Sequence, residues 1–300
     1  MPKVSIIIAT RNRSELLRSA VDSARNAGSD IEIVVVDDAS DDSTRELCSG
    51  WTDILYLRAR RRLGPGGARN AGIIASTSEY ISFLDDDDLR LPGSIDAQVK
   101  LLEERPKVGM VYGRVRYRNQ QGQPAEDSYI EQCPQGDVFR KLLHWNFVPC
   151  PSVVFRRSCL QRVGLLEQEA YGLEDWDLWV RIAELYEAVA VEEAVAIWRK
   201  PNFDSGQFTS RPERLHRLAH RLLRDKWLKL PRASEISGSE RRQILRAFVE
   251  RAADQLIWAA AERASSGHVR DFARVTTTLA GMYPLTGSRR AVVAIARRLL

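Results

Sequence analysis

The 300-residue chain has a globular composition: 44% of its residues are hydrophobic, and 45 Lys and Arg stand against 40 Asp and Glu, for a net charge of +5. This composition excludes a disordered chain and can bury one large core or two smaller ones. A run of about 18 apolar residues, the minimum for a membrane-spanning helix, is missing. The first apolar run ends at Arg11, too early for a secretory signal. The four cysteines lack metal-ligand or redox spacing, so we expect a reduced, cytoplasmic protein.

Positive charge is concentrated at the carboxyl end. Residues 211–300 carry 19 Lys and Arg against 8 Asp and Glu, a net charge of +11, which leaves −6 for the rest of the chain. A basic tail suits an anionic membrane surface or nucleic acid. A solvated helical domain that happens to be basic explains the same charge.

The first 105 residues alternate between strand and helix patterns. Continuous apolar runs, typical of strands buried on both faces of a parallel sheet, are separated by segments with helical spacing. The predicted strands are residues 3–10, 31–40, which ends in acids, 54–59 and 80–84; the predicted helices are 14–28, capped by Ser14, 41–50, and a glycine-rich loop running into a helix over 64–76. This order predicts an α/β fold with a doubly wound, mostly parallel sheet.

The pattern changes after Pro106. The sequence predicts a strand entering a hairpin over 108–124, a strand and helix over 151–164, a loop opening an amphipathic helix over 171–186, and a final pair of strands over 187–200. From Pro212 the chain turns helical and basic. We therefore expect a sheet domain at residues 1–208 and a basic, α-helical carboxyl-terminal region at 209–300.

Two acidic clusters follow predicted strands: Asp37 with Asp38, and Asp85 to Asp88. In sheets of this kind ligands bind at the carboxyl ends of the strands, where strand order should bring the clusters together. A carboxylate there can accept hydrogen bonds from a nucleobase or from ribose hydroxyls. Capping of the next short helix is the competing structural role for Asp37 and Asp38.

The run of four aspartates also suits a divalent cation. Adjacent carboxylates repel one another and are costly to bury unpaired. Mg²⁺ or Mn²⁺ cancels this repulsion by taking one or two of them as ligands. In an extended segment Asp85 and Asp87 would point to one side and Asp86 to the other. A solvated, turn-forming loop is the alternative.

Two further segments carry candidate site residues. In "LGPGGARNAG", glycines permit close backbone approach, and Arg69 adds a cation beside a helix start, where phosphates are favoured. The spacing fits neither the Rossmann fingerprint nor a P-loop. In "LEDWDLWVR", Glu174 and Asp175 lie at a helix start, which they can cap, as we expect of Asp177. An acid beside Trp176 can instead act as a general base.

Five motifs in order resemble the inverting family 2 glycosyltransferases of the GT-A fold. They are VSIIIATRNR, VVVDDASDDST, GPGGARNAG, FLDDDD and EDWDLWVR, and they cover residues 4–200. Each motif is loose alone, and their order carries the resemblance. It implies a GT-A domain at 1–208, with a nucleotide-binding half at 1–105 and an acceptor-binding half at 106–208. The helical region at 209–300 lies outside the resemblance.

The resemblance also implies roles for individual residues. Asp175 is the implied catalytic base, and Asp87, with Asp85, the implied ligand of Mn²⁺ or Mg²⁺. Asp86 departs from the family pattern, in which this position is often small and uncharged. The implied donor-binding residues are Thr10, Arg11, Asp37, Asp38, Arg69, Asp85 and Asp86. The residues assigned to the acceptor side are Glu174, Trp176 and Arg199, the last as a basic residue after the final strand.

The implied activity is a metal-dependent, inverting transfer of a sugar from a nucleotide-diphosphate sugar, with a UDP-sugar preferred. The implied acceptor is a hydroxyl of a saccharide or a lipid-linked glycan in surface polysaccharide or glycolipid synthesis. The segment RRAVVAIARRLL pairs arginines with an apolar face, so we expect docking on the cytoplasmic face of a membrane. Packing against its own domain or at a dimer contact explains that segment as well.

Two other functions are alternatives. A sugar-nucleotide nucleotidyltransferase would also hold Mg²⁺ on an α/β sheet, but such enzymes usually carry a glycine-rich basic loop where this chain has ATRNRSELL. Non-enzymatic nucleic-acid binding would use the basic tail, which lacks interleaved aromatics and a known motif. We therefore expect no nucleic-acid partner.

Overall fold

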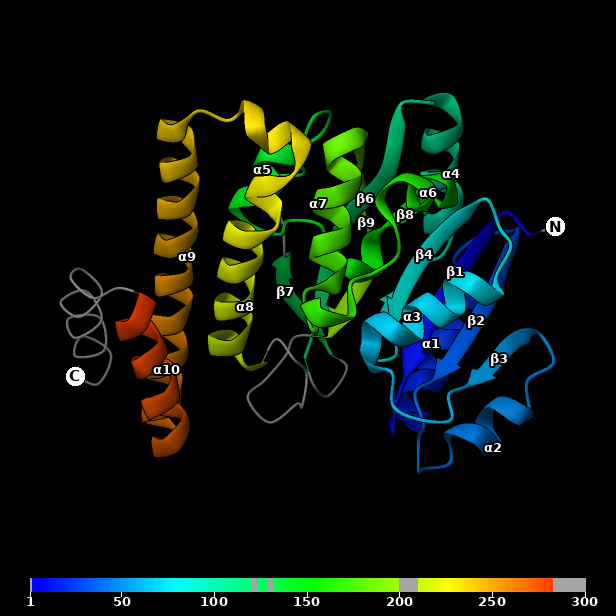
Figure 1. The fold of residues 1–300 in the computed structure, drawn as a ribbon. Helices are drawn as coiled ribbons and strands as arrows, with labels where there is room; N and C mark the ends of the chain where they lie inside the picture. The colour runs from blue at the N-terminus through cyan, green and yellow to red at the C-terminus, as the bar shows by residue number, and fades with distance from the viewer. Residues whose placement is uncertain (1, 120–122, 129–131, 200–209, 283–300) are drawn as a thin grey trace. The chain divides into compact units, whose positions relative to one another are not determined.

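The computed structural model describes residues 2–119, 123–128, 132–199 and 210–282. The chain forms two compact units, whose helices and strands are labelled in Figure 1. The sheet unit comprises Met1–Leu142 and Asn146–Pro201, and the helical unit comprises Leu143–Trp145 and Asn202–Leu300.

The elements of the sheet unit begin with the alternation of strands and helices that the sequence predicts. Its strands are β1 (Val4–Thr10), β2 (Ile31–Asp37), β3 (Ile54–Arg58), β4 (Tyr80–Asp85), β5 (Leu89–Arg90), β6 (Val108–Arg118), β7 (Pro124–Ser128), β8 (Val154–Arg156) and β9 (Glu187–Arg199). Its helices are α1 (Ser14–Arg25), α2 (Thr44–Ser49), α3 (Gly64–Ala75), α4 (Ser94–Glu104), α6 (Leu160–Val163) and α7 (Glu174–Leu185). Both units share α5 (Phe139–His144), and the helical unit contains α8 (Pro212–Asp225), α9 (Gly238–Ser265) and α10 (Val269–Met282).

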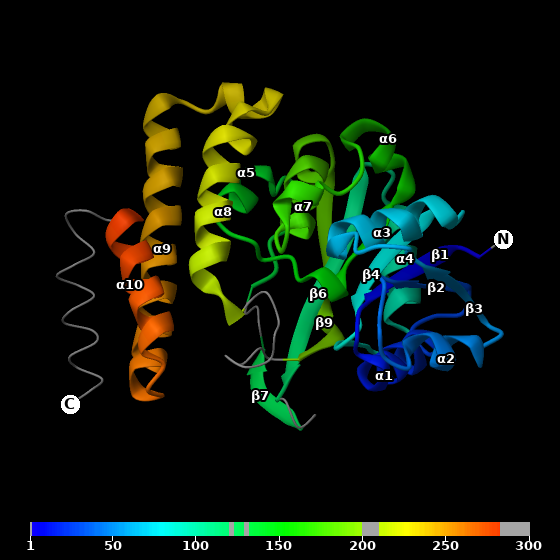
Figure 2. The same ribbon diagram turned by 60° about the horizontal axis from the view of Figure 1, so that its bottom comes forward.

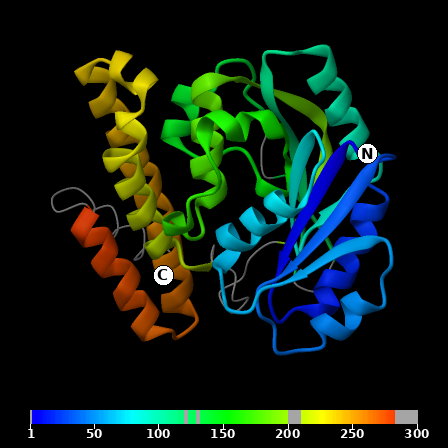
Figure 3. The ribbon, with the colours of Figure 1, turned by 45° about the vertical axis from the view of Figure 1, so that its right-hand side comes forward.

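Nine strands of the described chain form one mixed sheet, in the order β3-β2-β1-β4-β8-β6-β9-β5, with β7 paired to β6. The first four are parallel and lie side by side in Figure 3, as their continuous apolar runs predict. Then β8 runs antiparallel to β4 and β6, whereas β6 and β9 are parallel. The predicted α/β sheet is confirmed, and its antiparallel pairs all involve strands after β4.

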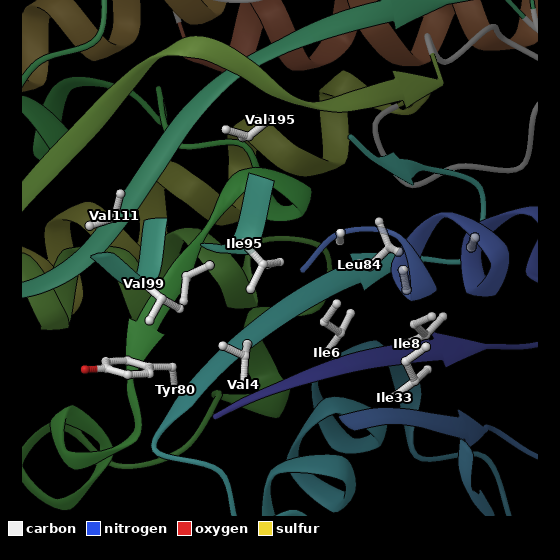
Figure 4. Packing of buried hydrophobic residues seen from close by; sticks show 14 of the residues in the cluster. Val4, Ile6, Ile8, Ile33, Tyr80, Leu84, Ile95, Val99, Val111 and Val195 are labelled. Carbon is white, nitrogen blue, oxygen red and sulfur yellow. The ribbon is translucent and has the colours of Figure 1, made fainter. Parts of the chain in front are cut away.

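One face of this sheet is covered by α1, α2 and α4. Val4, Ile6 and Ile8 point to this face because alternate residues of a strand point the same way. The cluster that they form with apolar side chains of these helices is buried, and Figure 4 shows its centre. The labelled partners from other elements are Ile33, Tyr80, Leu84, Ile95, Val99, Val111 and Val195.

The opposite face carries α3 and α7. The backbone of α3 lies close to β1 because Gly72 has no side chain: a Cβ there would lie 2.5 Å from Cγ2 of Ile7. Helix α7 places Trp179 against Phe83 and Phe155, with ring centroids 6.2 and 5.7 Å apart. Packing thus fixes both helices against the strands whose ends carry the acidic clusters.

The strand register aligns the carboxyl ends of β2, β1 and β4. Thr10 pairs with Asp37, and Ala9 pairs with Asp85. The two acidic clusters therefore lie on either side of β1, at the edge where ligands bind in such sheets.

Three local elements differ from the sequence prediction. The glycine-rich segment is not a loop, because α3 already begins at Gly64, where a carboxylate from another loop caps it. Residues 187–199 form the single strand β9, which pairs with β6 at both of its ends and shifts register between Val191 and Ala194. Ser14 does not cap α1; it is the first helical residue, and its amide donates to Oδ2 of Asp42 at 3.1 Å.

The helical unit is built from α8, α9 and α10, which pack against one another (Figure 2). Leu256 and Ala260 of α9 and Val275 and Leu279 of α10 form its buried apolar cluster. Within the described ranges, every helix is too short or too polar to cross a bilayer. The arginine-rich segment at 289–300, for which we predicted membrane docking, lies outside the described residues.

Replacing Gly72 with alanine should destabilise the sheet unit. The new methyl group would overlap Ile7, at 2.5 Å, and crowd Val36, at 3.2 Å, and both of these side chains are buried in the core. Overpacking of this kind costs about 1–3 kcal/mol, more than the gain in helix propensity of about 1 kcal/mol. Urea unfolding followed by tryptophan fluorescence measures the loss. Gly281→Ala is the matched control, since a Cβ there meets nothing within 4 Å; equal stability of the two variants would contradict the close-packing argument.

Candidate active site

The acidic run at residues 85–88 forms a turn, here named the acid turn. Asp85 ends β4, and the amide of Asp88 donates to the carbonyl of Asp85 at 3.1 Å. The expectation that Asp85 and Asp87 share one side of an extended segment is therefore wrong. The strand stops at Asp85, and side chains alternate only while the backbone is extended.

Asp86 and Asp87 share one guanidinium group. Nη1 of Arg13 donates to Oδ1 of Asp86 at 3.0 Å and to Oδ2 of Asp87 at 3.2 Å. The hydroxyl of Thr10 donates to Oδ2 of Asp86 at 2.8 Å, which places this predicted residue at the acid turn. Burial raises the pKa of Asp87 to about 7; repulsion from Asp86 and Asp85 adds to the rise, and Arg13 opposes it.

The sequence motif predicted a donor-binding role for Arg11 and gave no role to Arg13. Arg11 is exposed, and a donor-binding role for it stays a prediction. Arg13 returns to the edge of the sheet because Asn12 adopts a left-handed φ of 55°, a conformation that asparagine tolerates better than most residues. An asparagine two residues after the end of a strand was the available signal for that turn.

Asp88 ties the acid turn to the end of β9. Its buried Oδ1 accepts a hydrogen bond from the amide of Arg199 at 2.8 Å. Arg118, the strand partner of Arg199 on β6, donates through Nη2 to the carbonyl of Asp87 at 2.7 Å. The structure therefore brings Arg199 beside the predicted metal ligands, and it adds Arg118, which no motif indicated.

The two acids after β2 both hold protein groups. Asp38 accepts hydrogen bonds from the amides of Leu63, at 2.5 Å, and Gly64, at 3.0 Å, so it caps α3. Asp37 is fully buried and accepts from the amide of Ser40 at 2.7 Å and the hydroxyl of Tyr56 at 2.8 Å. The sequence suggested capping of the next short helix, whereas Asp38 caps α3, which follows the next strand. Contact of either acid with a nucleotide stays a prediction.

Arg69 joins three elements of the site. It lies on α3, is 6% exposed, and donates to Oδ1 of Asp85 at 2.5 Å and to Oε1 of Glu174 at 2.7 Å. Its guanidinium also lies over the ring of Phe83, 5.5 Å from the centroid. Glu174 begins α7 and accepts the amide of Gly172 at 2.6 Å through its other oxygen. The Arg69 bridge thus brings the start of α7 to the acid turn.

Asp175 follows Glu174 and is only partly buried. Burial, aided by repulsion from Glu174, raises the pKa of Asp175 to about 7, against the opposing effect of Arg69. Its Oδ1 accepts a hydrogen bond from the amide of Trp176 at 2.7 Å. A carboxyl group that changes protonation near neutral pH has the property that general acid–base chemistry requires.

The neighbouring residues of α7 have structural contacts. Trp176 is buried and donates from Nε1 to the carbonyl of Leu142 at 2.9 Å. Asp177 is fully buried and accepts from Nε of Arg181 at 2.9 Å, so it forms an ion pair within the helix. An acceptor-side role for Trp176 stays a prediction.

The acid turn suits a cation that is completed by a substrate. Within the described ranges, no three His, Cys, Asp or Glu side chains converge on one point as a ready-made ligand set. Mg²⁺ sites commonly use only one or two carboxylates and take their remaining ligands from substrate phosphates and water. Burial, together with repulsion from Asp86 and Asp85, raises the pKa of Asp87, and a divalent cation would relieve that repulsion. These residues therefore fit a divalent cation bound together with a phosphate group.

Replacing Arg69 with methionine should strongly destabilise the sheet unit. The substitution leaves Asp85 and Glu174 without the cation that both contact. Breaking a buried pair from one side typically costs about 3–5 kcal/mol, to be measured by urea unfolding. Arg61→Met, at an exposed position before α3, is the control and should change stability by less than about 0.5 kcal/mol. Equal losses of unfolding free energy in the two variants would show that the Arg69 bridge does not stabilise the sheet unit.

Comparison with known proteins identifies the family. The model of glycosyl transferase family 2 matches residues 5–164. An uncharacterized glycosyltransferase of Methanocaldococcus jannaschii is 24% identical, and the match covers 75% of this chain and 80% of that protein. The GalNAc(5)-diNAcBac-PP-undecaprenol beta-1,3-glucosyltransferase of Campylobacter jejuni is 34% identical over 61% of this chain and 60% of that protein. An uncharacterized glycosyltransferase of Rickettsia typhi is matched over 61% of its length, so the chain spans about three fifths of some relatives.

Solved structures of glycosyltransferases share the fold. TarS (residues 1–349) of S. aureus in complex with UDP-GlcNAc matches with a TM-score of 0.62 at 17% identity, over 87% of this chain and 80% of that one. The mannosyltransferase PcManGT of Pyrobaculum calidifontis, in complex with GDP-Man and Mn²⁺, matches with a TM-score of 0.56 at 20% identity, over 99% and 85%. The sheet unit has the GT-A architecture that the motifs implied. Because the family match spans more than half of its residues, the chain belongs to glycosyl transferase family 2.

Proposed function

We propose that the protein is a metal-dependent, inverting glycosyltransferase that moves a hexose from a UDP-sugar to a hydroxyl group of a saccharide or lipid-linked acceptor. Residues 1–105 would bind the nucleotide and residues 106–208 the acceptor. The family match favours this function over a sugar-nucleotide nucleotidyltransferase. Complexes of the structural relatives with UDP-GlcNAc and with GDP-Man and Mn²⁺ support a nucleotide-sugar donor.

One observation carries the proposal: Arg69 contacts both Asp85 of the acid turn and Glu174, the neighbour of Asp175. A group that titrates near neutral pH and a group of carboxylates suited to a cation are thereby held at one edge of the sheet. Inverting transfer needs this pairing, because a base must activate the acceptor while positive charge stabilises the departing diphosphate.

The donor would lie along the ends of β1, β2 and β4. Asp38, with Asp37 behind it, would meet the base and ribose, with Thr10 and Arg11 lining the same pocket. Asp87 and Asp85 would hold Mn²⁺ or Mg²⁺, and Asp86 would support them. When bound, the cation supplies positive charge that stabilises the diphosphate leaving group. Arg118 and Arg199 lie beside Asp87 and Asp88 and would add to that charge.

Arg69 would act by positioning rather than by direct contact with the pyrophosphate. The resemblance placed Arg69 among the donor-binding residues, near the pyrophosphate, but the guanidinium is buried and already serves two carboxylates. Those ion pairs fix Asp85 and the start of α7 relative to each other.

The transfer step then follows from Asp175. Its carboxylate takes the proton of the acceptor hydroxyl, and the acceptor oxygen forms a bond to the anomeric carbon on the face opposite the leaving group. The bond from the anomeric carbon to the phosphate oxygen breaks, and the nucleoside diphosphate leaves with the electron pair. The anomeric configuration is inverted. Glu174 holds the position of Asp175 through Arg69 and the amide of Gly172.

The acceptor is proposed from a relative and from charge. The name of the Campylobacter jejuni relative describes action on an undecaprenol-linked glycan. Residues 211–300 carry a net charge of +11, which favours contact with an anionic lipid surface. We therefore include a lipid-linked acceptor at the cytoplasmic face of a membrane in the proposal.

Nucleotide binding tests the donor and the metal together. Calorimetric titration with UDP should show binding that depends on Mn²⁺, weakened on the order of tenfold or more by EDTA, because the cation links carboxylate to diphosphate. GDP and dTDP should bind more weakly. Asp87→Asn should abolish the Mn²⁺ dependence. Asp30→Asn, an exposed acid before β2 at the other edge of the sheet, should behave as wild type. Absence of binding by all three nucleotides with Mn²⁺ would refute the proposed function.

Replacing Asp175 with asparagine should reduce turnover on the order of a hundredfold or more, because the acceptor proton loses its base. UDP affinity should stay within about threefold of wild type, since Asp175 is not a proposed nucleotide ligand. Glu169→Gln, an exposed acid shortly before α7, is the control and should retain activity. Loss of UDP affinity in proportion to turnover would assign Asp175 to donor binding instead.

The pH dependence of turnover provides an independent check on Asp175. The catalytic form is the carboxylate, and its pKa is raised to about 7. At saturating Mn²⁺ and donor, turnover should therefore be maximal above that pH and fall roughly tenfold per pH unit below it. The small residual activity of Asp175→Asn should lack this inflection.

A further inference from the structure

The acid turn carries its own cation. The guanidinium of Arg13 bridges Asp86, at 3.0 Å, and Asp87, at 3.2 Å, through a single nitrogen. The side chains of both aspartates are 7% exposed, whereas that of Arg13 is 30% exposed. Arg13 is thus the more solvent-exposed partner of both carboxylates.

Asp85, the other predicted metal ligand, is arranged differently. Its side chain is 34% exposed, and its cation is the buried Arg69. A metal ion arriving from solvent therefore meets Asp85 directly, whereas at Asp87 it meets the positive charge of Arg13, which already holds Oδ2. The two ligands assigned to the metal are unequally accessible in the same turn.

We infer that Arg13 occupies the place of a cation on Asp87 in the free protein and makes metal binding depend on the nucleotide. This inference rests on the metal site of the proposed function. Metal alone must compete with a guanidinium for Asp87, and its own charge is repelled by that guanidinium. When metal and diphosphate arrive together, the released donors of Arg13 pair with the diphosphate, an interaction that guanidinium groups make strongly. Arg13 then exchanges its contacts with the two aspartates for contacts with the diphosphate, and the free energy of this exchange is small.

The arrangement has a clear chemical benefit. A free acid turn with four carboxylates would bind divalent cations without a donor, and it would be unstable without any cation. Arg13 supplies the charge that keeps the turn folded, and Thr10 holds Asp86 in place at 2.8 Å. The metal site is therefore completed only in the presence of the substrate that needs it.

The test is Mn²⁺ binding, followed by the electron paramagnetic resonance signal of the free ion. In Arg13→Gln, affinity for Mn²⁺ alone should rise on the order of tenfold, because the competing charge is gone. With saturating UDP, the wild type and Arg13→Gln should agree within about threefold. The matched control is Arg18→Gln, which removes the same charge from an exposed position of α1 and should leave both affinities unchanged.

Arg13→Lys addresses the case in which the glutamine variant fails to fold. Lysine keeps the charge, but its ammonium is more strongly hydrated than a guanidinium and competes less well for the carboxylates, so affinity for Mn²⁺ alone should rise several-fold. A folded variant at position 13 that binds Mn²⁺ no more tightly than wild type overturns the inference, while the proposed function stands if UDP still recruits Mn²⁺. Failure of wild type to bind Mn²⁺ even with UDP overturns both.

Discussion

Compensation of negative charge at one edge of the sheet is the constraint on which the rest of the site depends. Four consecutive carboxylates cannot share a buried turn unless cations from elsewhere reach them. Arg13 after β1, Arg69 on α3 and Arg118 on β6 each contribute one. None of these arginines is close to the acid turn in sequence. Folding of the sheet therefore stabilises the acid turn. The acid turn in return fixes the positions of the segment after β1, of α3, of β6 and of β9.

The same contacts assemble the two halves of the proposed chemistry. Asp85 belongs to a strand and Glu174 to a helix 89 residues later, yet one buried guanidinium serves both. Buried ion pairs often add little net stability, but removing one partner is costly. Such a pair therefore favours a single arrangement of α7 against β4. For an enzyme, holding a base in one position is worth more than a small gain in stability.

Much of the sheet could be predicted from the sequence, because its information is local. The apolar runs of β1, β2 and β4 identify buried parallel strands, and their order places Asp37 and Asp85 on either side of β1. The roles of Asp38, Arg69 and Arg13 could not be predicted in this way. Each depends on a partner more than 15 residues distant, and Arg13 also depends on the left-handed turn at Asn12. Spacing along the chain does not indicate whether Arg11 or Arg13 reaches the acid turn.

The bond between Asp88 and position 199 has a further consequence for variation among related chains. Asp88 holds the backbone amide of that residue and not its side chain. The bond therefore constrains where the last residue of β9 lies, but it sets no preference for which residue stands there. Proline alone is excluded, because it has no amide hydrogen to donate. Related sequences can thus exchange the side chain at this position while the strand end keeps its anchorage.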